Sequence, residues 1–394
     1  MAIATDRPGI ARRMEVLAPH FFATLSAQIN AMTTAGMDVI RLDEGAPDLP
    51  PAKHIIEALE HSAEKPDRHS YQPHRGNANL RQAWADMYRR VYGVDVDPEK
   101  EVLPLLGSKE GIFHLAQIYI EAGDRVLIPD PGYISYTRGT LFAGGEPYYF
   151  ALQPDKGYLP DFGAIPGDVL RRAKLLWLNY PNNPTGAVAS AEFFTEAVEF
   201  ARTHHLLLCH DAAYTQVTYH GEPSLSVLAP PGAKEVAVEF NTLSKSHNMA
   251  GWRVGALVGN PEVIRQLFVL KTNADSSHFL PVMEAAAAAM QSDQHWLVER
   301  NEIYRRRRDI VLETLQRLGL SAQTPRASFY VWSSIPPGWS SVDFVSALLK
   351  EAQVSLTPGV LFGQNGEGYV RISITAPAER ITQAMQRLEN WITI

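Results

Sequence analysis

The stretch that decides the fold reads Ser244-Lys245-Ser246-His247-Asn248-Met249-Ala250-Gly251-Trp252-Arg253-Val254-Gly255, and it follows an apolar run over residues 236–240. The apolar run is typical of a buried strand, and a lysine after such a strand can form a Schiff base with an aldehyde. Burial lowers the pKa of the lysine amine, so a larger fraction is deprotonated and able to attack. A lysine in this position is by itself more often a surface residue, so the prediction depends on the rest of the chain.

Two further polar clusters follow apolar runs upstream. Asn182-Asn183-Pro184-Thr185-Gly186 comes after residues 175–178, and Asp211-Ala212-Ala213-Tyr214 comes after residues 206–209. Alone, the first is a good turn sequence and Asp211 could simply cap a helix. In open α/β sheets, however, ligands bind beyond the carboxyl ends of the strands. Three polar clusters that share this placement therefore predict one common site.

The residues in these clusters are those that pyridoxal phosphate (PLP) needs. Lys245 can bind the aldehyde, and Asp211 can keep the pyridine nitrogen protonated, which makes the ring an electron sink. Tyr214 and Asn183 can hydrogen-bond the phenolic oxygen of the ring. Tyr133, which follows Pro-Gly after another apolar run, offers an aromatic face for stacking, although such a tyrosine more often packs in a core.

Donors for the phosphate stand in two places. Gly107-Ser108-Lys109 opens a helical pattern, whose free N–H groups and dipole attract anions. This glycine-containing segment lacks the Walker pattern and is a weak signal alone. Ser244 and Arg253 add a hydroxyl and a bidentate guanidinium on the other side. The sequence therefore predicts PLP as the cofactor and predicts no metal site.

A chain of 394 residues suggests two domains. Short apolar runs alternate with helical patterns between residue 50 and about residue 280. The strands are expected at 102–106, 125–128, 175–180, 206–210, 236–240 and 254–258, and helices over 108–122 and 191–203. Strands that are buried on both faces and separated by helices predict an α/β fold with a doubly wound, mostly parallel sheet. This large PLP-binding domain is assigned to residues 49–284.

The last part of the chain changes character. Two long helical patterns, 285–318 and 342–352, flank β-like runs at 329–333 and 369–373, which predicts a smaller α+β domain over residues 285–394. Residues 37–42 read as a strand before a turn at 45–48. We therefore expect the N-terminal segment, residues 1–48, to pack with the small domain.

Composition excludes several classes of protein. The net charge is −7, so nothing in the overall charge points to nucleic acid. The run from Arg305 to Arg308 stands among acidic residues and is predicted to be a solvated helix face. The single cysteine, Cys209, excludes an intrachain disulfide. No apolar stretch reaches the roughly 18–20 residues of a membrane helix, and residues 1–8 lack a signal-peptide core, so the cytoplasm is the default expectation.

At these residues the chain resembles the fold-type I PLP-dependent aminotransferases of class I/II, and the resemblance runs from Gly45-x-Pro47-Asp48 to Arg371. Its specific set is Asn183-Pro184-Thr185-Gly186, Asp211-x-x-Tyr214, Ser244-Lys245 and Gly251-x-Arg253-x-Gly255. The resemblance implies an aminotransferase that moves an amino group between an L-amino acid and a 2-oxo acid, with glutamate and 2-oxoglutarate as one pair. It also implies an internal aldimine on Lys245 and a homodimer with shared active sites.

The resemblance assigns each site residue a role. Lys245, Asp211 and Tyr214 are implied to be catalytic, with Asn183 and Tyr133 as further contacts to the cofactor ring. The phosphate cup is implied to consist of Ser108, Lys109, Ser244 and Arg253, with Tyr71, in Tyr71-Gln72-Pro73-x-x-Gly76, lent by the neighbouring subunit. Arg371 is implied to grip the substrate α-carboxylate, near Asn183 and the backbone of Gly45.

Two segments resemble one branch of that family, which holds LL-diaminopimelate and glutamate–pyruvate aminotransferases. They are Gly107-Ser-Lys-Glu-Gly-Ile and Gly45-Ala-Pro-Asp-Leu-Pro. The segment after Tyr71 reads His74-Arg75-Gly76, whereas diaminopimelate enzymes usually carry a glutamate before this glycine, so the departure speaks against diaminopimelate as substrate. Alanine, aspartate and methionine stay open, and Lys109 could favour acidic substrates.

Two other functions remain as alternatives. The same lysine and arginine serve other PLP reactions on this fold, such as a carbon–sulfur β-lyase or a cyclopropane-forming synthase. A PLP-binding regulator would usually carry a DNA-binding module, for which the chain has no spare segment. A stable half-reaction that yields pyridoxamine phosphate separates the aminotransferase from the other enzymes.

Overall fold

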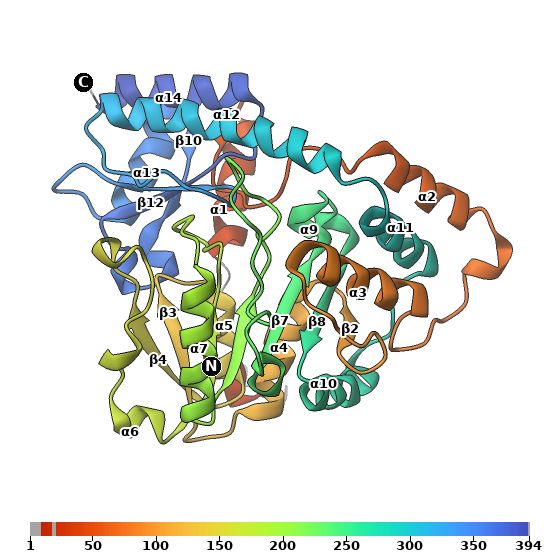
Figure 1. Cartoon of the computed structure of the whole chain (residues 1–394). Coiled ribbons are helices and arrows are strands. Elements are labelled where there is room, and N and C mark those ends of the chain that lie inside the picture. The colour runs from red at the N-terminus through yellow and green to blue at the C-terminus, as the bar shows by residue number, and fades with distance from the viewer. Residues whose placement is uncertain (1–8, 18–20, 393–394) are drawn as a thin grey trace, which may run out of the picture.

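The computed structural model describes residues 9–17 and 21–392, and its centre is a seven-stranded sheet (Figure 1). In the order in which they lie side by side, the strands are β2 (Val102–Leu105), β8 (Gly255–Gly259), β7 (Ala237–Thr242), β6 (Leu207–Asp211), β5 (Ala173–Leu178), β3 (Arg125–Asp130) and β4 (Glu146–Ala151). Only β8 runs antiparallel to its neighbours. The predicted mostly parallel α/β sheet is confirmed, and the six expected strands agree with the observed ones within two residues at each end.

The seventh strand, β4, is absent from the expectations. It is an edge strand that pairs only with β3, and most of its side chains are exposed or half-buried. It also contains Pro147, which is tolerated at a sheet edge but weakens a strand prediction. An edge strand therefore lacks the continuous apolar run by which the buried strands were recognised.

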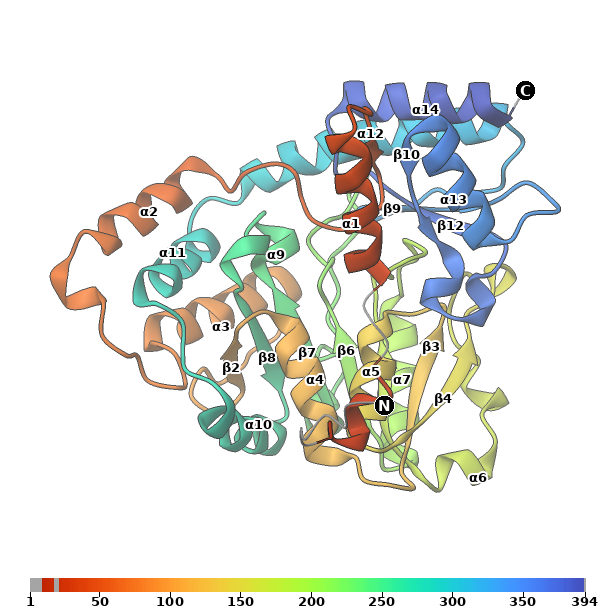
Figure 2. The same cartoon turned by 180° about the vertical axis from the view of Figure 1, so that it is seen from behind.

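Helices cover both faces of this sheet (Figures 1 and 2). One face carries α4 (Ser108–Tyr119), α5 (Ile134–Phe142) and α10 (Pro261–Ala274), and the other carries α3 (Ala78–Tyr92) and α7 (Ala191–Thr203). The boundaries of α7 are those predicted, because the Ser190 hydroxyl accepts a hydrogen bond from the Phe193 N–H at 3.2 Å and caps the helix. The shorter helices are α6 (Gly167–Leu170), α8 (Ala233–Val236) and α9 (Leu243–Ser246).

The C-terminal part surrounds a separate three-stranded sheet. Its strands are β11 (Thr357–Pro358), β12 (Tyr369–Ser373) and β9 (Tyr330–Ser334), and its helices are α13 (Ser341–Ala352) and α14 (Ala378–Ile392). The predicted N-terminal strand is only two residues long, β1 (Ile40–Arg41), and pairs in parallel with β10 (Val354–Ser355). Helix α1 (Phe21–Thr34) precedes it. The division of the chain at residues 48 and 284 stays a prediction.

The long helix expected over residues 285–318 is wrong in one respect, because the structure breaks it into two. Helix α11 (Leu280–Gln291) packs on α2 (Lys53–Ala63), and α12 (His295–Arg317) runs from there to α14. Ser292 adopts an extended conformation with ψ 173°, and the Asp293 carboxylate accepts the His295 N–H at 2.9 Å. A turn at residues 292–294 thus interrupts a helical pattern that helix propensity alone would continue.

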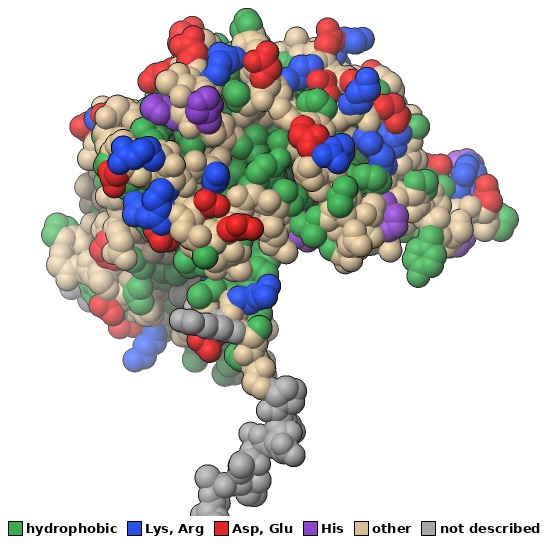
Figure 3. All heavy atoms as spheres, turned by 90° about the horizontal axis from the view of Figure 1, so that it is seen from below, with side chains coloured by type: hydrophobic (Ala, Val, Ile, Leu, Met, Phe, Trp, Pro, Cys, Tyr) green, Lys and Arg blue, Asp and Glu red, His purple; other side chains and the backbone are tan. Residues whose placement is uncertain are grey.

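The arginine run in α12 also differs from its prediction. Arg307 and Arg308 are buried, and Arg307 donates to both carboxylate oxygens of Asp48, at 2.8 and 3.0 Å. Only Arg306 is mostly solvated. The face of the molecule in Figure 3 shows acidic and basic side chains interspersed. Among the described residues, no helix combines the length and apolar character needed to cross a bilayer.

Candidate active site

A cavity of about 600 Å³ opens at the carboxyl ends of the parallel strands. Its lining includes eleven of the twelve predicted site residues: Gly45, Ser108, Lys109, Tyr133, Asn183, Asp211, Tyr214, Ser244, Lys245, Arg253 and Arg371. The volume lies in the usual range for a small-ligand site. The polar clusters seen in the sequence therefore do converge.

Lys245 lies in the cavity at the end of the short helix α9. The Thr242 hydroxyl caps this helix by accepting the Ser244 N–H at 3.1 Å, directly after β7 ends. The Lys245 amine donates to the Gly45 carbonyl oxygen at 2.5 Å. Burial, together with the positive charges of Arg371 and Arg253, lowers the pKa of Lys245 to about 8. At pH 7 roughly a tenth of the amine is therefore deprotonated, far more than for a free lysine, and can act as nucleophile or base.

A buried arginine of α12 donates hydrogen bonds to the backbone around Lys245. Arg300 donates to the Lys245 carbonyl at 3.0 Å and to the Ser246 carbonyl, and it also reaches the Gln216 carbonyl at 3.0 Å. The first two carbonyls belong to the last turn of α9, where a cation is favourable. Burial lowers the pKa of Arg300 to about 10.

Asp211 is the last residue of β6 and has one free oxygen. Its Oδ2 accepts a hydrogen bond from the Tyr136 hydroxyl at 2.8 Å, and the Tyr136 ring stacks on Trp177 with 4.7 Å between centroids. Its Oδ1 is buried, and among the described residues no donor lies in hydrogen-bonding geometry to it. Burial raises the pKa of Asp211, and the hydrogen bond from Tyr136 opposes that rise. The free oxygen is available to a donor in the cavity.

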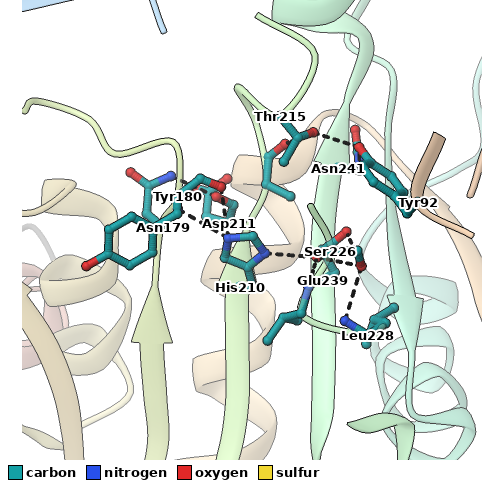
Figure 4. Close-up of polar contacts among 12 residues, drawn as sticks. Tyr92, Asn179, Tyr180, His210, Asp211, Thr215, Ser226, Leu228, Glu239 and Asn241 are labelled. Carbon is teal, nitrogen blue, oxygen red and sulfur yellow. Dashed lines mark hydrogen bonds and ion pairs between the residues drawn. The ribbon is translucent and has the colours of Figure 1, made fainter. Parts of the chain in front are cut away.

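The backbone around Asp211 is fixed by a buried polar network (Figure 4). Asn179 Nδ2 donates to the Asp211 carbonyl oxygen at 2.7 Å. His210, the preceding residue, points to the opposite face of the sheet, where its Nδ1 lies 2.8 Å from Glu239 Oε2 and its Nε2 lies 3.0 Å from the Tyr180 carbonyl. The ring of His210 thus links β6 to β7 and to the segment that follows β5.

Glu239, in β7, completes this network. Its two oxygens accept hydrogen bonds from the Tyr88 hydroxyl at 2.8 Å, the Ser226 hydroxyl at 3.0 and 3.1 Å, and the Val227 N–H at 3.0 Å. The side chains of Glu239 and His210 are completely buried. Every oxygen of this carboxylate therefore has a partner, in contrast to Asp211.

The end of the cavity that is predicted to bind the phosphate lies at the start of α4. No side chain caps this helix at Gly107, so its first N–H groups stay available to a ligand. Gly107 has φ +86°, and a Cβ there would lie 2.2 Å from Arg253 Nη2. Arg253 is held by a hydrogen bond to the Ala250 carbonyl at 2.8 Å, with Ser244 Oγ at 3.5 Å. A glycine is thus needed for the guanidinium to reach the helix N-terminus.

Arg371 enters the cavity from β12 of the smaller sheet. Its Nη1 donates to Asn183 Oδ1 at 2.9 Å and its Nη2 to the Asp43 carbonyl at 2.9 Å, while Nε has no partner among the described residues. The guanidinium carbon lies 4.2 Å from the Tyr330 ring centroid and 4.9 Å from that of Phe362. The planar group is therefore held against two aromatic rings, with its Nε–H and the second Nη1–H still free.

Tyr214 lines the cavity and contacts a second tyrosine there. Its hydroxyl lies 2.7 Å from the hydroxyl of Tyr330, and a Cβ at Gly45 would be only 2.3 Å from that same Tyr330 oxygen. Gly45 therefore leaves the space in which Tyr330 stands. The sequence analysis included Tyr214 and Gly45 but missed Tyr330.

Tyr71 is the one predicted residue that the chain does not bring to the cavity. It is 93% exposed and lies on the segment between α2 and α3, which extends away from the rest of the molecule in Figure 1. Such a position gives it no contact with Lys245 of its own chain.

Several cavity or supporting residues escaped the sequence analysis. They are Tyr136, Asn179, His210, Glu239, Tyr330, Arg138 and Arg300. All but Arg138, which only lines the cavity, contact a partner on a strand or helix other than their own, and none stands in a recognisable motif. For Asn179 a weak signal exists, since it directly follows the apolar run that ends at Leu178.

The residues of the cavity fit PLP. A low-pKa amine, a buried carboxylate oxygen without a donor and an uncapped helix N-terminus with an arginine beside it match its aldehyde, its ring nitrogen and its phosphate. Tyr133, half-buried at the start of α5, offers the aromatic face. The fold and the cavity together define a PLP-dependent enzyme of the fold-type I class.

Comparison with known proteins identifies the particular family. Residues 37–388 match the family described as aminotransferase class I and II, so the chain belongs to that family. The LL-diaminopimelate aminotransferase of Moorella thermoacetica is 48% identical over 378 residues, 96% of this chain and 97% of that protein. The enzyme of the same name from Syntrophobacter fumaroxidans is 46% identical over 378 residues, with 96% and 97% covered.

Solved structures agree with this result. The apo structure of BacF from Bacillus subtilis superposes with a TM-score of 0.94 at 37% identity and covers 98% of both chains. A probable N-succinyldiaminopimelate aminotransferase from Thermus thermophilus has a TM-score of 0.89 at 35% identity, with 94% of this chain and 99% of that chain covered. The protein is a PLP-dependent aminotransferase, as predicted, and the fold-type I architecture is confirmed.

Proposed function

We propose that this aminotransferase uses L-amino acids that carry a second carboxylate, with glutamate and 2-oxoglutarate as one pair. LL-diaminopimelate, named for the relatives at 42–48% identity, is proposed as the other amino acid. The His74-Arg75-Gly76 segment speaks against it, but a single departure weighs less than that identity over nearly the whole chain. The observation that carries the choice of α-amino acids is that Arg371 and the Lys245 amine line one cavity, and the choice of a second carboxylate rests on the names of these relatives.

The residues divide the chemistry among themselves. PLP, when bound, supplies an aldehyde and a ring that withdraws electrons from the substrate Cα. Lys245 Nζ is proposed to bind that aldehyde and, once the substrate amine has replaced it there, to hold and move the Cα proton as a free amine of lowered pKa. Asp211 Oδ1 is proposed as the acceptor for the ring nitrogen, and Tyr214 and Asn183 as contacts of the ring oxygen. Arg371 is proposed to bind the substrate α-carboxylate through its free Nε–H.

A half-transamination screen tests the function. The PLP-loaded enzyme is mixed with single amino acids, and the visible spectrum is followed as the cofactor becomes pyridoxamine phosphate. We expect glutamate and LL-diaminopimelate to give the fastest conversions. Conversion by alanine or methionine alone contradicts the substrate assignment, and elimination products without pyridoxamine phosphate point to a β-lyase.

A homodimer with shared sites belongs to the proposal, because Tyr71 is exposed and does not line the cavity of its own chain. We propose that it contacts the phosphate in a second copy. Lys245→Ala and Tyr71→Phe subunits, mixed and re-annealed, then form hybrids with one intact site. At limiting PLP, activity above that of both parents supports the shared site. Activity no higher than the Tyr71→Phe parent shows that both residues serve the same subunit.

A further inference from the structure

Tyr330 contacts two residues of the proposed chemistry and has no role of its own so far. It is the first residue of β9, lines the cavity and is only 2% exposed. Its hydroxyl lies 2.7 Å from the Tyr214 hydroxyl, and its ring centroid lies 4.2 Å from the guanidinium carbon of Arg371. One side chain of the smaller sheet thus touches both the residue proposed for the ring oxygen and the residue proposed for the α-carboxylate.

Strand pairing places the Tyr330 ring against Arg371. β9 runs antiparallel to β12, and Tyr330 lies opposite Ser373, two residues after Arg371. Residues two apart in a strand point to the same face, so Tyr330 and Arg371 are diagonal neighbours on one face of this sheet. Aromatic and long side chains bridge that spacing, and the ring therefore restricts the position of the guanidinium from one side.

The direction of the hydrogen bond between the two hydroxyls follows from the need of the cofactor. Burial, and after it the neighbouring Tyr330, raise the pKa of Tyr214, so the Tyr214 hydroxyl keeps its proton at neutral pH. A hydroxyl has one proton to donate and two lone pairs that accept. If Tyr214 donates its proton to the ring oxygen of PLP, as proposed, only Tyr330 can donate in the 2.7 Å contact. The result is a chain of hydrogen bonds from Tyr330 through Tyr214 to the ring oxygen.

Such a chain acts on Tyr214 in two ways. Donation by Tyr330 polarises the Tyr214 hydroxyl and strengthens the bond that it donates, by roughly 10–30%. It also orients the hydroxyl, because an accepted hydrogen bond limits the directions in which the remaining proton can point. The two rings meet edge to face, with 5.5 Å between centroids and 73° between planes, so packing holds the hydroxyls in this position.

We propose that Tyr330 is a positioning residue with two parts: its hydroxyl orients Tyr214 toward the ring oxygen, and its ring orients Arg371 toward the α-carboxylate. The inference rests on the proposed function, which it deepens. Tyr330 acts through these two residues, and each effect belongs to a different part of its side chain. Substitutions can therefore separate the effect of the hydroxyl from that of the ring.

Tyr330→Phe removes the hydroxyl and keeps the ring. The measurement is the pH at which the visible spectrum of bound PLP changes, because a hydrogen bond to the ring oxygen stabilises its deprotonated form and lowers that pH. We expect Tyr330→Phe to raise it by roughly 0.1–0.6 pH unit, which corresponds to losing 10–30% of a charged hydrogen bond, and Tyr214→Phe to raise it further. In Tyr214→Phe, the additional change Tyr330→Phe should have no effect. Tyr149→Phe, at an exposed position outside the cavity, is the control.

Tyr330→Leu removes the ring as well. The measurement is the affinity of the PLP-loaded enzyme for propionate, a carboxylate without an amino group, by calorimetry. We expect propionate to bind about two- to thirtyfold more weakly to Tyr330→Leu than to Tyr330→Phe, the range of one cation–π contact. Tyr330→Met, which also has no ring, provides the same comparison should the leucine variant fail to fold.

The outcomes separate this inference from the proposed function. If Tyr214→Phe shifts the spectral pH and Tyr330→Phe does not, or if the effect of Tyr330→Phe persists in the double variant, the role of the hydroxyl is wrong. Equal propionate binding by the leucine and phenylalanine variants overturns the role of the ring. If Tyr214→Phe shifts nothing, the proposed contact of Tyr214 with the ring oxygen fails and the role of the Tyr330 hydroxyl with it. If no amino acid is transaminated while both expected changes are observed, the proposed function fails and the inference stands.

Discussion

Asp211 and Glu239 are both buried carboxylates, and they stand on neighbouring strands of the same sheet. Glu239 faces the side covered by α3 and α7. There its oxygens accept hydrogen bonds from two hydroxyls and one backbone N–H, and the ring of His210 lies beside them. Asp211 faces the cavity side, where Tyr136 contacts one oxygen and the other has no donor among the described residues. A carboxylate thus has partners for both oxygens on one face of the sheet and for only one oxygen on the other.

This difference distinguishes residues that bind a ligand from residues that stabilise the fold. A buried charged group without its full set of hydrogen bonds costs about 1–3 kcal/mol, and in the cavity a bound ligand can supply the missing partner. Lys245, with its lowered pKa, and Arg371, with its free Nε, share this property with Asp211. Substitutions on the cavity side should therefore change activity, and those in the Glu239 network should change stability.

Lys245→Ala is expected to have the largest effect. The residue both binds the cofactor and moves the proton, so turnover should fall by more than the roughly 10⁴-fold upper range of acid–base catalysis alone. Thermal stability should not fall, because the substitution removes a buried amine. Steady-state assays and thermal unfolding measure both, with Lys174→Ala, at an exposed position, as control. Near-normal turnover with PLP present shows that Lys245 is not the catalytic lysine.

Asp211→Asn should follow. It keeps the shape but removes the charge opposite the ring nitrogen, so kcat should fall on the order of 10²–10³-fold, the cost of removing one preorganised charged group. The stability at neutral pH should stay equal or rise, because burial raises the pKa of Asp211 and disfavours its ionised form. Exposed Asp168 provides the matched control. A large loss of stability with unchanged kcat places Asp211 with Glu239 and removes the contrast.

Glu239→Gln should show the opposite pattern. An amide presents one acceptor instead of two, so donors such as Ser226 and Val227 lose a partner, and unfolding should become easier by about 3 kcal/mol. Below the unfolding transition, kcat should change much less than in Asp211→Asn. Chemical denaturation and kcat are compared with Glu196→Gln, at an exposed position. Unchanged stability with a strongly reduced kcat means that the network acts on catalysis.

The pH dependence of Lys245 should give the smallest effect. In the cofactor-free protein its pKa is lowered from 10.5 to about 8, so between these values the unfolded chain holds a proton that the folded chain has released. Stability contributed by this site therefore rises with pH across that window, and the cost of the buried ammonium is fully present below it. Lys245→Met lacks the amine, so its stability advantage over wild type should shrink between about pH 7 and about pH 10. An advantage that widens means that the amine is not desolvated; thermal unfolding at both pH values decides.

Much of the site could be predicted because strand order hardly matters to it. Asn183, Asp211 and Lys245 each follow an apolar strand, and the carboxyl ends of parallel strands meet at one edge in whatever order they pair. Gly45, Tyr71 and Arg371, which lie outside the large sheet, came only from resemblance to a family. The helices and buried strands were predictable for a related reason, since their patterns are local and repeat within a few residues.

Only the tertiary structure shows which polar groups have hydrogen-bond or charged partners. That His210 meets Glu239 requires β6 to lie beside β7 in one register, and that Tyr136 meets Asp211 requires α5 to cover the cavity side of the sheet. Arg138 shows the same limit, because it reaches the cavity lining through the packing of α5 against α4 and stands in no motif. Sequence patterns determine which residues point inward, whereas hydrogen bonds and charge interactions act over a few ångströms and depend on neighbours that only the folded chain brings together.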